Sequence, residues 1–390
     1  MKTTRNGAFG FWKFIFCMVI VLHYAYFFNP QKAESGSFLF YRGELAFDFF
    51  FLLAGMMLAE SVNRIPEDRT LVWSDTRSFL KVQLRRYLPG LIICWIISFA
   101  VLNTICWIDL ESLNTNFFAS MLELLPVHSA GFNIIPPVSD SLVGYRVMDQ
   151  AWVFSAVMLA FFVLYPLYLS NRKRFEYYIA PVGAALLLGF LFFKTQVLTG
   201  DNLMILDAKN KELYFLTPGA YKAFGEILAG VACYALVRHL SGKQVSRGKA
   251  HLLSLVEVGG YVAALAYMQR MLALELPKRF DYLAAGCILI AAAVTLSGKS
   301  SLSKPFDNRF FRFLGRFSLY PFLTFLLFAK TLTYFLPDAG IKKLTVIYLA
   351  LTLASAVLLM LAEKPFVRAV KSLKRLFIKP CPQSRREEAA

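Results

Sequence analysis

Long apolar stretches separated by short polar segments are the main pattern in this chain of 390 residues. A helix that crosses a bilayer needs about 20 mostly apolar residues. Ten stretches meet or approach this length, so we predict an all-α, polytopic transmembrane bundle of about ten helices. The predicted spans are 9–28, 41–60, 87–107, 151–169, 178–193, 220–237, 252–273, 282–297, 313–329 and 344–362.

The basic residues give this bundle a predicted orientation. With the N-terminus inside, the inner segments carry more than twice as many Lys and Arg as the outer segments. Cytoplasmic segments of membrane proteins show this excess. The longest predicted outer segment, 108–150, has Arg146 as its one basic residue and five acidic residues. We therefore predict that both chain ends are cytoplasmic, which requires an even number of spans.

The two ends of the chain each allow more than one interpretation. The first span carries Lys13 inside its apolar run, and no small-residue cleavage site follows, so we interpret it as an uncleaved helix rather than a signal peptide. We assign residues 1–363 to the bundle. Residues 364–390 form a predicted basic cytoplasmic tail that lies on anionic lipid.

Composition supports a membrane protein over a soluble one. Hydrophobic residues make up 57% of the chain and charged residues 17%, whereas soluble domains are about half apolar and a quarter charged. The net charge of +17 does not indicate a nucleic-acid partner, because the basic residues lie between apolar spans. No Cys-x-x-Cys pair or Cys/His cluster occurs among the six cysteines, so we expect neither a disulfide nor a metal site.

The first span holds the most suggestive side chains. Lys13 lies near its inner end and His23 ten residues later, about 15 Å further along a helix. Histidine is the side chain best suited to accept a proton at neutral pH. Polar groups inside spans are costly and are usually functional. His23 is therefore a candidate general base; the alternative is a histidine that is hydrogen-bonded within the bundle or lies near the headgroups. We expect it to face inward with Phe16 or Ile20, and Val21 and Leu22 to face lipid.

Charged residues also mark the second and third spans. Asp48 and Gly55 are seven residues apart and share a helix face, where Asp48 can orient a histidine, pair with a buried cation or lie at the outer interface. Lys81, Arg85 and Arg86 precede the third span. Paired arginines at a cytoplasmic mouth can bind phosphates, although anchoring by positive charge is the ordinary alternative.

Taken in order, these stretches resemble the acyltransferase-3 family of integral membrane O-acyltransferases. The resemblance includes Lys13 to His23, Phe47 to Gly55 and the run from Arg85 to Pro89. It continues through Trp152-Val153-Phe154-Ser155, through 221–230 and through Leu314-Gly315-Arg316-Phe317-Ser318. It covers nearly the whole chain, and the ordered set is more specific than any one motif.

The chain also departs from the family pattern. Family members usually space the basic residue and the histidine of the first helix by eleven positions, but Lys13 and His23 are ten apart. The residue eleven positions after Lys13 is Tyr24. Either the helix register slips, or Trp12 occupies the basic position, or the catalytic pattern is degraded. Gln83 stands where the family has the first arginine of Arg-x-x-Arg, and Ala54 where it has serine. A histidine late in the family's ninth helix is absent.

The resemblance implies an acyltransferase that moves an acyl group, commonly acetyl, from cytoplasmic acyl-CoA to a hydroxyl of a cell-surface glycan or its lipid-linked precursor. It implies His23 as general base and Asp48 as its supporting carboxylate. Lys13, Lys81, Arg85 and Arg86 would bind the donor, and a bacterial inner membrane would be the location. Two alternatives remain open from the sequence: a transporter or flippase for a lipid-linked sugar, and a catalytically degenerate family member that acts in envelope assembly.

Overall fold

The computed structural model describes residues 7–25, 39–66, 71–106, 117, 120–121, 124–125, 147–148, 150–195, 217–269, 280–336 and 340–377. Within these ranges every regular element is a helix, and none is a strand. The elements are α1 (Gly7–His23), the 3₁₀ turn η3 (Gly43–Leu45), α3 (Ala46–Asn63), α4 (Val72–Cys106), α6 (Ala151–Ser170), α7 (Arg172–Arg174), the π-helical turn η6 (Phe175–Ile179), α8 (Ala180–Thr195), α9 (Pro218–Gly242), α10 (Arg247–Met268), α12 (Asp281–Ser297), α13 (Ser303–Phe306), α14 (Arg309–Phe317), α15 (Leu319–Phe335) and α16 (Ile341–Phe377).

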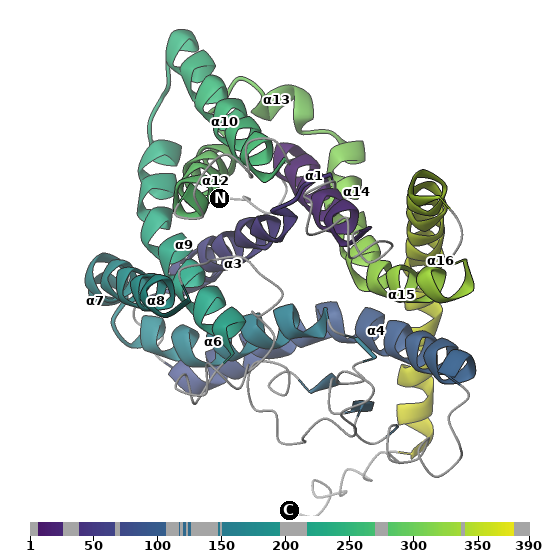
Figure 1. Cartoon of the computed structure of the whole chain (residues 1–390). Helices are drawn as coiled ribbons and strands as arrows, with labels where there is room; N and C mark the ends of the chain where they lie inside the picture. The colour runs from purple at the N-terminus through teal and green to yellow at the C-terminus, as the bar shows by residue number, and fades with distance from the viewer. Residues whose placement is uncertain are drawn as a thin grey trace, which may run out of the picture.

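Each predicted span overlaps one of these helices or two consecutive elements, so the all-α transmembrane prediction is confirmed. Seven helices in the described part of the chain are long and apolar enough to cross a membrane, or eight if the bent pair α14 and α15 is one span. Two more apolar helices, Gly7–His23 and Asp281–Ser297, are shorter at 17 residues each. Together they account for the ten predicted stretches, and they pack side by side as one bundle (Figure 1).

The third span starts much earlier than predicted. Helix α4 begins at Val72, so residues 72–86, which were expected to belong to an inner loop, are helical. It is held by the ring of Phe79, which stacks on that of Tyr165 in α6 with centroids 4.2 Å apart. Lys81, Arg85 and Arg86 therefore lie on a helix, and their directions are set by its period.

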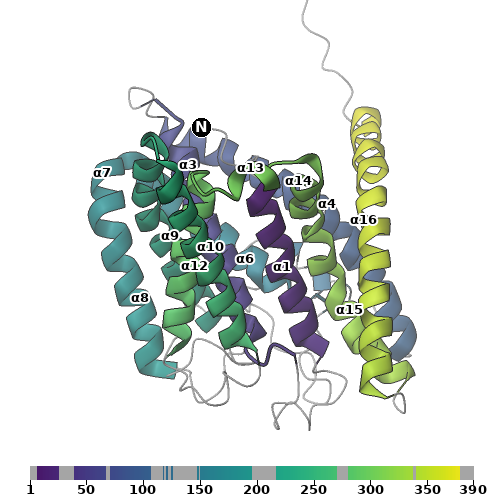
Figure 2. The ribbon, with the colours of Figure 1, turned by 90° about the horizontal axis from the view of Figure 1, so that it is seen from above.

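The predicted inner segments gather at one end of the bundle. Figure 2 shows the start of α1, α7, α13 and the C-terminal end of α16 at the same end. Hydrogen bonds join these segments, including one from Arg172 Nη1 to the Ile65 carbonyl at 2.6 Å. At the opposite end, the main-chain N–H of Arg42 donates to the Met268 carbonyl at 3.1 Å. This arrangement agrees with the alternation of predicted inner and outer segments.

Helices α3 and α9 form the closest crossing at the centre. A Cβ at Gly55 would lie 2.0 Å from the Ile227 carbonyl oxygen, and one at Gly230 would lie 2.1 Å from that of Leu52. Only glycine lets the two backbones meet in this way, as small residues do at membrane helix interfaces. The crossing places the polar face of α9 against α3 and so positions the buried charges described below.

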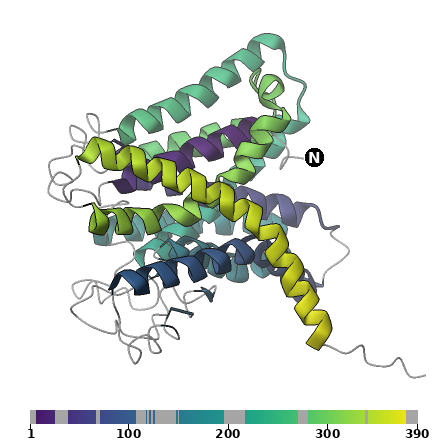
Figure 3. The ribbon, with the colours of Figure 1, turned by 90° about the vertical axis from the view of Figure 1, so that its right-hand side faces the viewer.

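The predicted boundary at residue 363 falls inside a helix. Helix α16 continues through Pro365 to Phe377, and Figure 3 shows that it bends along its length. Proline bends helices because it lacks an N–H and its ring displaces the preceding turn. The tail from 364 therefore starts as an extension of the last span, and residues 378–390 lie outside the described ranges.

Candidate functional site

His23 is the last residue of α1, and its side chain is buried at the outer end of the bundle. Its Nδ1 lies 2.9 Å from the main-chain carbonyl oxygen of Phe40. A carbonyl only accepts hydrogen bonds, so Nδ1 carries a proton, and in a neutral ring the lone pair is therefore on Nε2. Nε2 lies 3.5 Å from a carboxylate oxygen of Glu44. This arrangement directs the basic nitrogen of the imidazole toward an acid.

Glu44 was missed by the sequence analysis. It lies in η3 and is 8% exposed, so it is a buried carboxylate next to a buried histidine. The sequence spacing could have identified Glu44, because it precedes Asp48 by four residues and residues four apart share a helix face. A carboxylate beside an imidazole stabilises its protonated form.

Asp48 was predicted to orient a histidine, to pair with a buried cation or to lie at the outer interface. In the structure it pairs with a buried cation. The Asp48 carboxylate lies 2.5 Å from Lys222 Nζ, and Glu226 lies 3.8 Å from the same nitrogen. All three residues are at most 1% exposed. Buried charges in a bilayer are stable only when paired, so the three groups link α3 to α9. Lys222 and Glu44 also lie near enough to interact electrostatically.

Lys13 and Trp12, the two candidates for the basic position of α1, have different surroundings. Trp12 is buried, and its indole N–H donates to Glu257 at 3.3 Å while its ring packs on Tyr261. Lys13 lies over the ring of Phe9 and lines a cavity at the inner end. Lys13 is therefore the cation of this helix that faces an open space.

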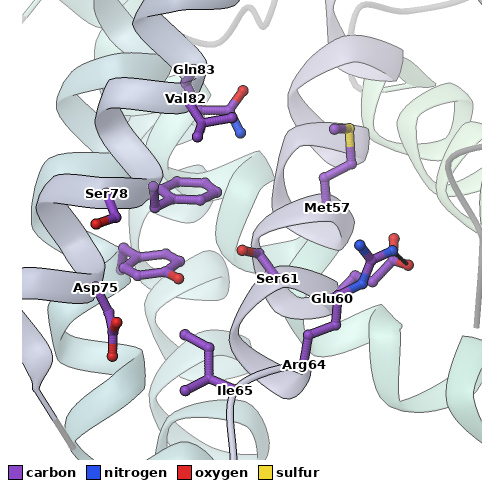
Figure 4. Close-up of a pocket in the computed structure, with 11 residues that line it drawn as sticks. Met57, Glu60, Ser61, Arg64, Ile65, Asp75, Ser78, Val82 and Gln83 are labelled. Atoms are coloured by element: carbon purple, nitrogen blue, oxygen red, sulfur yellow. Dashed lines mark hydrogen bonds and ion pairs between the residues drawn. The ribbon is translucent and has the colours of Figure 1, made fainter.

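Two neighbouring cavities lie at the inner end of the bundle. The larger, of about 430 Å³, lies between α3 and α4, with Arg64 and Gln83 on opposite walls (Figure 4). The smaller, of about 60 Å³, is lined by Lys13 and Arg86 among others. Met57 and Glu60 line both cavities, so the two are adjacent. Neither is lined by His23.

The face of α4 decides which predicted cations reach these cavities. Asp75, Phe79 and Val82 line the larger cavity, and Arg86 continues the same spacing of three or four residues into the smaller one. Lys81 and Arg85 are exposed and line neither cavity. Arg64 of α3 was missed by the sequence analysis; it forms an ion pair with Glu60 and lines the larger cavity.

Tyr24 lies just beyond α1, where its ring contacts other rings. Its ring packs against Phe325 of α15, with centroids 5.0 Å apart, and is edge-on to His23. The carboxylate of Glu44 lies beside His23, the candidate general base. The expectation that Val21 faces lipid was wrong, because Val21 is fully buried; Tyr348 of α16 donates a hydrogen bond to its main-chain carbonyl.

The described residues contain no group of three or more His, Cys, Asp or Glu side chains that is arranged to hold a metal ion. Cys17, Cys94, Cys233 and Cys287 are free thiols. The polar chemistry described here therefore consists of the outer His23–Glu44 pair, the central Lys222 triad and the inner cavities.

Comparison with protein families matches residues 8–362 to a family described as an acyltransferase domain. The match covers nearly the whole chain and includes every predicted site residue. Comparisons with curated proteins and with solved structures returned no match.

Proposed function

This chain belongs to the acyltransferase-3 family, and on that premise we propose that it transfers an acyl group, commonly acetyl, from cytoplasmic acyl-CoA to a hydroxyl of a glycan or of its lipid-linked precursor. Membership supports a membrane acyltransferase in general. One observation carries the finer proposal: a single helix, α1, presents Lys13 to an inner cavity and His23 to a buried carboxylate at the outer end.

The His23–Glu44 pair supports general base catalysis. The Phe40 carbonyl holds the proton of Nδ1, which leaves Nε2 to accept the proton of the acceptor hydroxyl. The hydroxyl oxygen then attacks the thioester carbonyl carbon, the carbon–sulfur bond breaks, and the proton passes from Nε2 to the thiolate. Glu44 stabilises the imidazolium that forms in between, and general base catalysis contributes about 10² to 10⁴ in rate.

In this proposal Asp48 acts through charge. Its ion pair with Lys222 fixes a cation near Glu44 and holds α3 against α9 beneath the His23 pair. This role differs from direct contact with His23 and keeps Asp48 as a proposed part of the catalytic site.

The inner cavities support a donor site. A volume of about 430 Å³ falls in the usual range for small-molecule pockets, about 300–1,000 Å³. Arg64, Arg86 and Lys13 provide cations for phosphates, and the smaller cavity extends toward α1. Lys81 and Arg85 are exposed at the same mouth and stay predicted contacts for the outer phosphates.

Stacked aromatic rings lie between the donor cavities and His23. Phe16 stacks on Phe49 with centroids 4.5 Å apart, and both rings contact Tyr261. All three residues are fully buried. Acyl transfer along α1 requires these rings to move, because no atom of the donor can pass through a packed aromatic layer.

The test compares His23→Ala with Tyr24→Phe at matched protein levels. Transfer from radiolabelled acetyl-CoA to a cellular glycolipid extract should fall by about 10²-fold or more in His23→Ala, because the general base is lost. Tyr24→Phe should retain nearly full activity. Full activity in His23→Ala would overturn the mechanism. A native protein that binds acetyl-CoA without turnover would instead indicate the degenerate family member.

A further inference from the structure

The turn that precedes α3 touches His23 at three points. The Phe40 carbonyl accepts from its Nδ1, and the Glu44 carboxylate faces its Nε2. The third contact is the bare Cα of Gly43. A Cβ placed there would lie 2.4 Å from His23 Cβ and 2.8 Å from Cγ, which is closer than real Cβ contacts occur.

The glycine at 43 is not explained by backbone conformation. Among the described residues, the glycine with a positive φ is Gly298, so Gly43 has a backbone that any L-residue can adopt. What excludes a side chain at 43 is the imidazole itself. This steric reason separates Gly43 from glycines that serve turns.

The same turn is fixed from its far side by α10 and α12. The guanidinium of Arg42 donates to Asp281 at 2.6 Å and to the hydroxyl of Tyr267. The Phe40 N–H donates to Gln269 at 3.3 Å. Arg42 and Asp281 are both buried, so this clamp is rigid.

The clamp holds Phe40 in a strained conformation. Its φ of 55° makes it the one non-glycine residue in the described part of the chain with positive φ. Such a conformation is unfavourable for an L-residue and persists only where the surroundings impose it. Here it directs one carbonyl to both the Gly43 N–H, at 2.8 Å, and His23 Nδ1.

We propose that Gly43 is a positioning residue for His23, and that the turn 40–44, clamped by Arg42 and Asp281, sets the place and tautomer of the imidazole. The role rests on the proposed function of His23. A displacement of about 1 Å in a reacting group can cost on the order of 10²-fold in rate. Any side chain at 43 would impose a displacement of this kind.

The first experiment compares Gly43→Ala with Gly286→Ala. A Cβ at Gly286 meets nothing within 4 Å, so it is a matched control near the same end of the bundle. With acetyl-CoA and a glycolipid extract, kcat should fall about 10- to 100-fold in Gly43→Ala, while the KM for acetyl-CoA stays unchanged. The acid limb of the pH profile should shift, because the contacts of the imidazole change. An unchanged kcat and pH profile in folded Gly43→Ala would overturn the proposal.

The second experiment needs no activity and is informative even if Gly43→Ala is unstable. The Tm in detergent is measured for Gly43→Ala alone and in a His23→Gly background. If the imidazole occupies the space, the drop in Tm should be much smaller once its side chain is removed. An equal drop in both backgrounds would overturn the proposal. Full activity of His23→Ala would reject the proposed function but would leave this result standing.

Discussion

At the inner end of α4, two adjacent arginines face different surroundings. Both side chains are exposed, but Arg86 lines the smaller cavity with Lys13, whereas Arg85 lines neither cavity. The cause is the helical period, which points consecutive residues in directions about 100° apart. The sequence predicts that both arginines contact the donor. Their directions in the structure indicate that Arg86 contributes more to donor binding than Arg85.

This ranking predicts unequal effects of two single substitutions. Arg86→Gln should weaken acetyl-CoA binding by about 1.5–3 kcal/mol, the value of a charged hydrogen bond. That loss corresponds to roughly 10- to 150-fold in Kd. Arg85→Gln should change Kd by about threefold or less, because Arg85 lines neither cavity and a charge without a defined partner at the surface contributes little.

Isothermal titration of the purified protein in detergent measures both constants under the same conditions. Equal losses in the two variants would show that the cavity does not define the donor site. An unchanged Kd in Arg86→Gln would assign both arginines to membrane anchoring.

At the scale of elements, the crossing of α3 and α9 holds the central charges in place. Gly55 and Gly230 bring the backbones together, and the Asp48–Lys222 ion pair lies on the same pair of helices. A buried ion pair keeps its geometry only while its helices keep their separation. The two glycines are therefore part of the support of the proposed catalytic site.

Gly230→Ala should lower stability by about 1–3 kcal/mol, the typical cost of overpacking a close contact. Its Cβ would lie 2.1 Å from a backbone oxygen that cannot move aside. Gly189→Ala is the matched control, since a Cβ there meets nothing within 4 Å. The measurement is the Tm of the detergent-solubilised protein. Equal Tm values for the two variants would contradict the close packing.

At the scale of the whole molecule, the arrangement of chain ends supports the predicted topology. The start of α1, α7, α13 and the end of α16 lie at one end of the bundle (Figure 2). The donor cavities lie at this end, and the His23–Glu44 pair lies at the other. The positive-inside rule assigns the first end to the cytoplasm.

A cysteine at Asn116 tests this assignment. Most of the predicted outer segment 108–150 lies outside the described residues. The segment contains one Arg and five acidic residues, and this low number of basic residues predicts an external location. Asn116→Cys should react with a membrane-impermeant thiol reagent in intact cells, at least tenfold faster than a cysteine placed at Ser246 between α9 and α10. Labelling of Asn116→Cys only after permeabilisation would reverse the topology.

Local properties of the sequence determined the helices, their alternation across the membrane and the candidate polar residues. A bilayer requires every spanning segment to be apolar and to satisfy its own backbone, so hydropathy alone identifies spans. His23, Asp48 and Lys13 were identifiable because charges and imidazoles inside apolar runs are rare.

Tertiary structure decided the partners of these residues. Asp48 pairs with Lys222, which is distant in the sequence, and His23 faces Glu44 across a turn clamped by Asp281. Such pairings depend on how helices rotate and cross, and a period of 3.6 residues gives each helix several faces that can meet a neighbour. Close backbone contacts such as that of Gly55 with α9 select one of these arrangements, which is why the site emerges only when the helices are packed.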